Sequence, residues 1–80
     1  MRARFVDVSA LPAPEPLQVV LDALGELAPG EYLVLAHRRE PFPLYELLAG
    51  RGFRHRVRRG SRTPFEILVW RAGSPPPAEA

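Results

Sequence analysis

Two histidines, His37 and His55, are the side chains of this sequence that titrate near neutral pH, so they are its first candidates for acid–base chemistry. A catalytic His37 would work with the nearby Glu40, but neither histidine lies in a local pattern that supplies a partner. His37 closes a predicted strand, where it can bond a backbone group, and His55 lies on the predicted inner side of another strand. We therefore expect no catalytic residue in this chain.

Cysteine is absent, which excludes disulfides, thiolate nucleophiles and zinc sites with sulfur ligands. Two histidines without cysteine also fall short of the four ligands that a structural metal site usually needs. We therefore expect neither a metal nor a bound cofactor.

The segment 51–62 holds six arginines and one histidine with no acidic residue, and it is the most unusual part of the sequence. From Phe53 to Arg59 polar and apolar residues alternate, which is typical of a half-exposed strand. The alternation places Arg54, Arg56 and Arg58 together on one face. This face would be a positively charged surface.

The strand that follows fixes what these arginines meet. A turn centred on Ser61 and Arg62 would join the two strands as an antiparallel hairpin. The resulting register pairs Arg58 with Glu66, Arg56 with Leu68, and Arg54 with Trp70, the last as a cation–π contact.

Three interpretations of this sheet face stay open. As a nucleic-acid surface, it would neutralise phosphates with Arg54, Arg56 and Arg58, while Trp70 and Tyr32 would stack on bases. As a protein interface or a homodimer contact, its mixture of Leu, Trp and Arg matches the composition of binding hot spots. As a solvated face, the carbon stems of its arginines would only cover apolar sheet surface, and their charges at the strand edge would discourage aggregation. The net charge of +2 argues against a dedicated nucleic-acid-binding protein.

Hydrophobic periodicity predicts four strands and two helices that would position these residues. The expected order is β-α-β-α-β-β, with strands over 4–8, 31–37, 53–59 and 65–71 and helices over about 14–29 and from Pro43 to Gly50 or Gly52. The first helix would turn Leu17, Val20, Leu21, Leu24 and Leu27 inward, and the second Leu44, Leu47 and Leu48.

This order predicts an α+β fold with two layers, in which both helices cover one face of a four-stranded mixed sheet. The apolar run Glu31–His37 is typical of a central strand, and the last two strands form the hairpin. The opposite face, with Phe5, Tyr32 and Val34 beside the arginines, would then lie open.

Two short motifs resemble a known family. Residues 13–16, Ala-Pro-Glu-Pro, stand where TusA and SirA-like domains begin their first helix with Cys-Pro-x-Pro. The second motif, Glu40–Tyr45 (EPFPLY), together with an earlier APGE turn, is similar to a cysteine-less, uncharacterised group of relatives of those domains. The resemblance covers residues 5 to about 71.

The resemblance implies a two-layer α/β sandwich in a setting of bacterial redox or nitrogen-oxide metabolism. It does not imply sulfur transfer, because Ala13 stands where those domains carry the reactive cysteine. Arg39 stands where the cysteine-less group carries a histidine, so no role of that histidine passes to this chain.

Two loops are expected at the same end of the sheet. Ala13–Glu15 follows the first strand and Glu40–Tyr45 follows the second, and loops at this end of α/β sheets commonly hold ligands. Free amides at the first helix start would attract an anion, although two prolines remove amides and Glu15 repels negative charge. A small-ligand or anion site stays open, beside the interpretation that these prolines only stiffen the chain.

Eighty residues suffice for one domain, expected over 1–72, with a Pro-rich tail at 73–80 that is expected to be disordered. No apolar run is long enough to cross a membrane, and we expect a cytoplasmic protein. We interpret the chain as a non-catalytic accessory module, monomeric or homodimeric, that binds a protein partner or itself through the open sheet face. Nucleic-acid binding is the alternative for that face.

Overall fold

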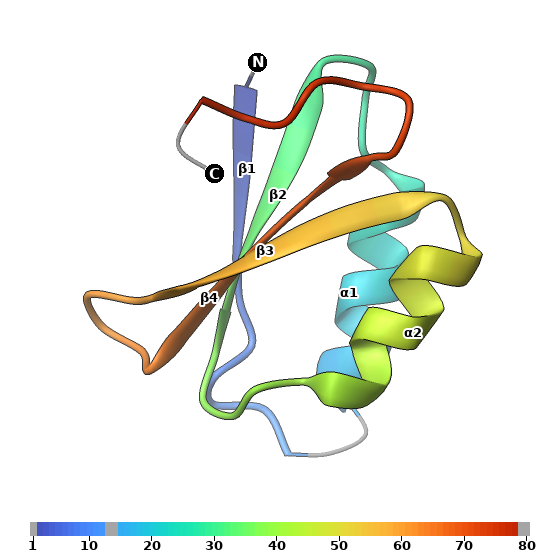
Figure 1. The fold of residues 1–80 in the computed structure, drawn as a ribbon. Coiled ribbons are helices and arrows are strands. Elements are labelled where there is room, and N and C mark those ends of the chain that lie inside the picture. Colours follow the sequence, from blue (N-terminus) through green and yellow to red (C-terminus); the bar gives the residue numbers. More distant parts are fainter. Residues whose placement is uncertain (1, 13–14, 79–80) are drawn as a thin grey trace.

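Six elements form in the expected order in the computed structural model, which describes residues 2–12 and 15–78 (Figure 1). The fold class is α+β, as the sequence predicts. The strands are β1 (Arg2–Asp7), β2 (Glu31–His37), β3 (Phe53–Arg59) and β4 (Phe65–Arg71), and the helices are α1 (Glu15–Gly25) and α2 (Phe42–Gly50).

The four strands form one mixed sheet in the order β1-β2-β4-β3. β1 pairs in parallel with β2, whereas β4 runs antiparallel to both β2 and β3. The apolar run of β2 lies in the centre, as its sequence predicts. The hairpin register is also confirmed, since Arg58 pairs with Glu66, Arg56 with Leu68, and Arg54 with Trp70.

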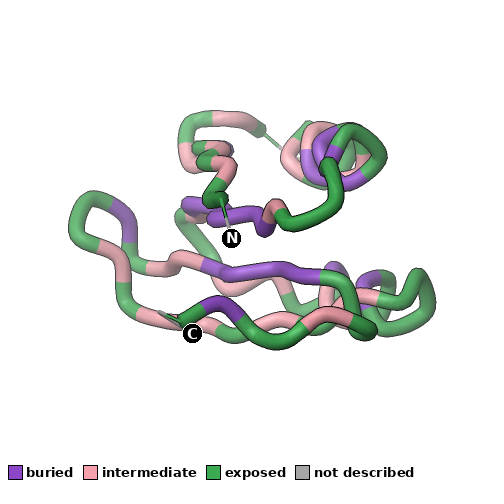
Figure 2. The backbone as a smooth tube through the Cα atoms, turned by 90° about the horizontal axis from the view of Figure 1, so that it is seen from above, coloured by how far each residue is buried: buried purple, intermediate pink, exposed green. Residues whose placement is uncertain are grey.

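The main core lies between the sheet and the two helices, which Figure 1 shows on one side of the strands. Buried positions gather on the two central strands, drawn as long purple stretches in Figure 2. Each helix contributes a short apolar stripe because its inward positions recur at helical spacing. The side chains that fill this core are Val8, Val20, Leu24, Leu33, Leu35, Leu44, Leu48, Ile67 and Val69.

The opposite sheet face is not open, which corrects the expectation from the sequence. Tyr32, Val34, Leu68 and Trp70 form a second buried cluster there, with Tyr32 8% and Trp70 5% exposed. Phe5, on the edge strand β1, is 59% exposed and remains the accessible ring of this face. The tail after β4 folds back across the ends of β2 and β1 (Figure 1), and its Pro77 is buried.

Helix α1 ends at Gly25, four residues before the predicted end at Pro29. Glycine is a poor helix former, and the carbonyls that follow it find arginines as partners. Arg4 Nη1 donates to the Glu26 carbonyl at 3.3 Å, and Arg71 Nη2 donates to the Leu27 carbonyl at 3.0 Å. These two side chains tie the end of the helix layer to β1 and β4.

Two leucines that helical spacing places inward are exposed. Leu17 on α1 is 37% exposed, and Leu47 on α2 is 36% exposed. Leu17 lies in the first turn of α1, and its side chain lines a groove rather than the core. Leu47 lines none of the hollows described below.

Candidate functional site

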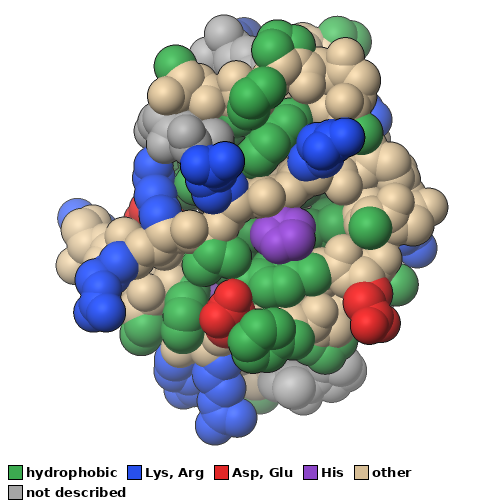
Figure 3. Space-filling model, in the orientation of Figure 1, with side chains coloured by type: hydrophobic (Ala, Val, Ile, Leu, Met, Phe, Trp, Pro, Cys, Tyr) green, Lys and Arg blue, Asp and Glu red, His purple; other side chains and the backbone are tan. Residues whose placement is uncertain are grey.

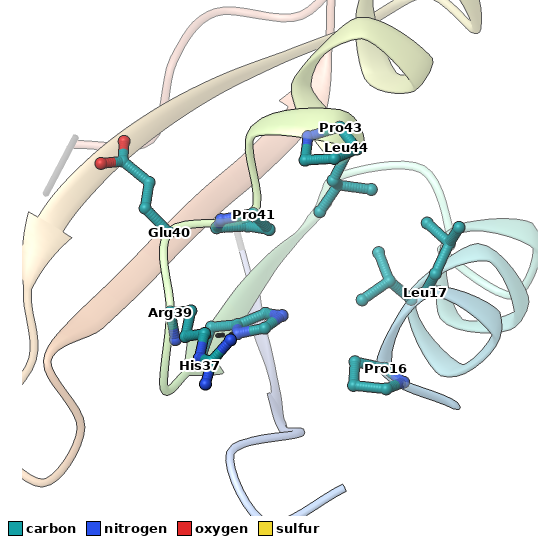
Figure 4. A pocket seen from close by; sticks show the side chains of 9 residues that line it. Pro16, Leu17, His37, Arg39, Glu40, Pro41, Pro43 and Leu44 are labelled. Atoms are coloured by element: carbon teal, nitrogen blue, oxygen red, sulfur yellow. Dashed lines mark hydrogen bonds between the residues drawn. The ribbon is translucent and has the colours of Figure 1, made fainter. Parts of the chain in front are cut away.

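A groove of about 420 Å³ opens where β2 ends and the two helices begin (Figure 4). Its apolar walls come from the first turns of both helices and from the loop between β2 and α2. The groove also has three polar residues, His37, Arg39 and Glu40. The apolar lining consists of Pro16, Leu17, Val20, Pro41, Pro43 and Leu44.

Prolines give this groove its apolar character. Pro16 lies in the first turn of α1, and Pro43 lies in the first turn of α2, positions that tolerate proline because the amides there have no partner within the helix. Pro41, just before α2, makes the loop itself stiff. Because proline has no N–H, these three residues present carbon surface where a helix start would otherwise present backbone donors. The site therefore favours an apolar ligand over an anion.

His37 is the polar side chain at the centre of the groove. Its ring points toward Pro16 and Leu17 (Figure 4), and its Nδ1 accepts a hydrogen bond from the Arg39 backbone N–H at 3.3 Å. This bond places the proton of the neutral ring on Nε2. Burial, with the charge of Arg38 adding to it, lowers the pKa of His37. The groove thus holds a neutral imidazole that can donate one hydrogen bond.

A second hollow, of about 290 Å³, continues from the groove toward the end of β1. The two hollows share Pro16, His37 and Arg39, so together they form one track along the end of the sheet. Arg38 lines the second hollow, and the side chains of both Arg38 and Arg39 are exposed. The remaining lining of the second hollow is Val8, Ser9, Leu11 and Pro12.

Glu40 and Tyr45, both predicted as site residues, are brought together by a hydrogen bond. The Tyr45 hydroxyl donates to Glu40 Oε2 at 3.1 Å, and burial together with Glu40 raises the pKa of the tyrosine. The Glu40 carboxylate turns away from the groove (Figure 4). The pair therefore fixes the loop against α2 rather than contacting a ligand in the groove.

His55 packs against the same tyrosine, as the predicted inward position suggests. Its ring stacks on Tyr45 with centroids 4.0 Å apart, and Phe42 meets Tyr45 edge-on at 5.9 Å. Burial lowers the pKa of His55, and the charge of Glu40 opposes this shift.

Apolar side chains gather in the centre of the face seen in Figure 3, with arginines around its periphery.

The predicted helix start is only partly described. Ala13 and Pro14 lie outside the described residues, while Glu15 is the exposed first residue of α1. Its neighbour Pro16 lines the groove opposite the β2–α2 loop, so the start of α1 and this loop lie at one end of the sheet. Glu15 itself does not line the groove.

The predicted arginine face is present in part. Arg54 and Arg56 are exposed, and Arg58 Nε donates to Glu66 Oε1 at 2.8 Å, the pair that the predicted register brings together. The rings expected to stack on bases, Tyr32 and Trp70, are buried, so Phe5 is the ring of this face that stays accessible. The cation–π contact in this hairpin joins Arg71 to Phe53, with 5.4 Å from Cζ to the ring centroid.

Within residues 2–12 and 15–78, no three His, Cys, Asp or Glu side chains come together in a way that could hold a metal ion. None of the helices in this part of the chain is long and apolar enough to cross a membrane.

Comparison with known proteins gives one match. A family model described as an uncharacterised conserved protein, DUF2249, matches residues 6–71, which include both walls of the groove. No curated protein and no solved structure matches the chain. The match carries no link to the TusA or SirA-like domains.

Proposed function

This chain belongs to the DUF2249 family of uncharacterised conserved proteins, and from its groove we propose that it is a non-catalytic module that binds an apolar segment of a partner protein. The observation that carries the proposal is the exposure of large apolar side chains around a preformed apolar hollow. Leu17, in the wall, is 37% exposed, and Phe42, between two lining prolines, is 65% exposed. Burying such side chains under a partner is favourable because apolar surface leaves water.

The polar residues of the groove define the partner segment further. His37 offers an Nε2–H that suits a backbone carbonyl or a carboxylate of the segment. Arg38 and Arg39 lie exposed along the same track and favour an acidic residue beside the apolar ones. The segment that fits best is therefore apolar, with a carboxylate at the end near β1.

The absence of catalysis is part of this proposal. It is supported by the state of His37, whose Nδ1 accepts the Arg39 N–H and so cannot take a proton from a substrate. His55 is held in a stack with Tyr45, and that tyrosine is kept protonated by burial and by its bond to Glu40. These titratable groups serve packing rather than proton transfer.

A relationship to TusA and SirA-like domains is the finer part of the proposal. It is supported by the element order β-α-β-α-β-β and by the prolines at the start of the first helix. In that relationship, Ala13 replaces the reactive cysteine, and the groove beside the helix start is what remains for recognition. The same relationship is the basis for proposing a place in bacterial redox or nitrogen-oxide metabolism.

The proposal is tested by selecting binders from a displayed library of random peptides with the full chain as bait. We expect enrichment of apolar peptides that carry an acidic residue. Leu17→Asp should weaken their binding about ten-fold or more, because it places a charge in an apolar contact.

Leu47→Asp is the matched control, since Leu47 is equally exposed on a helix but lies outside the groove. It should leave the affinity unchanged. Equal effects of the two substitutions, or no enriched peptide at all, would contradict the proposal.

A further inference from the structure

The sheet face away from the helices carries two buried aromatic rings near the end of the sheet that the C-terminal tail crosses. Tyr32 and Trp70 are buried there with Val34 and Leu68, although neither α1 nor α2 lies on this side (Figure 1). The tail turns back from β4 and crosses the ends of β2 and β1 (Figure 1). The sequence of the tail is Gly-Ser-Pro-Pro-Pro-Ala-Glu-Ala.

One proline of the tail is buried. Pro77 is buried, whereas Pro75 and Pro76 are exposed. Consecutive prolines favour the polyproline II conformation, in which side chains project at a regular three-residue period. An aromatic surface with a ring N–H beside it is the usual partner of such a segment, because rings pack on prolines and the N–H bonds a backbone carbonyl.

Trp70 carries an unused donor at this surface. Its Nε1 is buried and has no hydrogen-bond partner among the residues that the structure describes. A buried N–H without a partner is unfavourable, because the group has lost its bond to water. No described residue satisfies this donor, so a segment with a carbonyl in reach of Nε1 would bind this face more favourably.

Charge around the face adds a second feature of the ligand. Arg54 and Arg56 are exposed on β3 and pair in register with Trp70 and Leu68, so they border the buried cluster. An acidic residue near the prolines of a ligand would meet these arginines. The tail itself has this composition, since Glu79 follows the prolines in the sequence.

We propose that this face is a second binding site, which recognises a proline-rich, acidic segment of a partner protein, and that the chain's own tail is its resident, displaceable ligand. The site is separate from the groove, because it lies on the other side of the sheet and shares none of its lining residues. Partner binding would exchange one proline-rich segment for another. The gain on exchange would be a bond from Trp70 Nε1.

Trp70 is the single tryptophan of the chain, so its fluorescence reports on this face alone. In the full chain, Pro77→Ser should expose the ring, shift its emission to longer wavelength and increase quenching by acrylamide. Pro76→Ser, at an exposed neighbour, is the matched control and should leave both unchanged. Unchanged emission in Pro77→Ser would overturn the proposal.

The second step adds a synthetic peptide with the tail sequence 73–80 to the Pro77→Ser protein. The peptide should restore the emission saturably and shift the indole N–H resonance downfield, whereas a peptide with serine in place of all three prolines should do neither. Failure of the proline peptide, or equal binding of both peptides, would also overturn the proposal. Leu17→Asp should have no effect in this assay. The outcome for the aromatic face is thereby separated from the outcome for the groove.

Discussion

His37 shows how one side chain sets the chemistry of the groove. The sequence places it correctly at the end of a strand with a backbone partner nearby, and the structure supplies that partner as the Arg39 N–H. What the sequence does not contain is the direction of the ring, which points toward the first turn of α1. The ring lies among prolines and Leu17, where its Nε2–H can donate a hydrogen bond.

The pH dependence of stability follows from both histidines. The pKa of His37 and that of His55 lie below the ordinary value of 6.5 in the folded chain, mainly because burial disfavours the charged rings. The unfolded chain therefore binds more protons below about pH 6.5, and the free energy of unfolding falls as the pH falls through this range.

Urea denaturation at about pH 7.5 and about pH 5 measures this effect. We expect a lower midpoint at the acidic pH, and a smaller difference in the double variant His37→Gln, His55→Gln. A midpoint that rises on acidification, or a double variant with the full dependence, would contradict the assigned pKa directions.

Tyr45 tests the loop that forms one wall of the groove. Tyr45→Phe removes the hydroxyl that donates to Glu40 and leaves the stack on His55 in place. The free energy of unfolding should fall by about 0.5–1.5 kcal/mol, the usual contribution of one hydrogen bond. Chemical denaturation measures the loss.

A double-mutant cycle with Glu40→Ala provides the control for this prediction. Once the carboxylate is absent, Tyr45→Phe should cost little more, because the bond is already lost. Fully additive losses would show that the two side chains act independently.

At the scale of the elements, periodicity is enough to predict five of the six spans closely and the hairpin register completely. The exception is the end of α1, which depends on Arg4 and Arg71 reaching across from the sheet. Such contacts join residues far apart in sequence and leave no local pattern. The meeting of the two loops was predictable, because β1 and β2 are parallel and their carboxyl ends share one end of the sheet.

The end of α2 gives a prediction at this scale. Gly52 follows the helix with φ of +83°, a conformation that side chains with a Cβ disfavour, whereas Gly50 is helical with open space around it. Gly52→Ala should lower the free energy of unfolding by about 1 kcal/mol. Gly50→Ala should raise it by about 0.5–1 kcal/mol, since alanine favours the helix.

Thermal unfolding of the two variants measures this contrast. Both substitutions add one methyl group, and the two sites are two residues apart. Changes of opposite sign in the free energy of unfolding would therefore reflect the different backbone conformations of the two glycines. Destabilisation of similar size in both variants would contradict the described helix end.

At the scale of the whole molecule, the sheet separates the two surfaces that we propose for recognition. The groove lies at the carboxyl end of β2 among the helix starts, and the aromatic face lies on the other side under the tail. The sequence predicts the alternation that makes these faces, but it does not reveal that the tail covers one of them. A proline-rich composition suggests disorder on its own, and nothing in the local sequence indicates that Pro77 is buried.

The most direct test of the groove as the binding site is a map of amide chemical shifts. The full ¹⁵N-labelled chain is titrated with the tightest peptide from the library selection. We predict that the largest changes fall on residues 15–20 and 37–44, and that they vanish in Leu17→Asp but persist in Leu47→Asp. Changes centred on β3, or a map that Leu17→Asp leaves intact, would contradict the account.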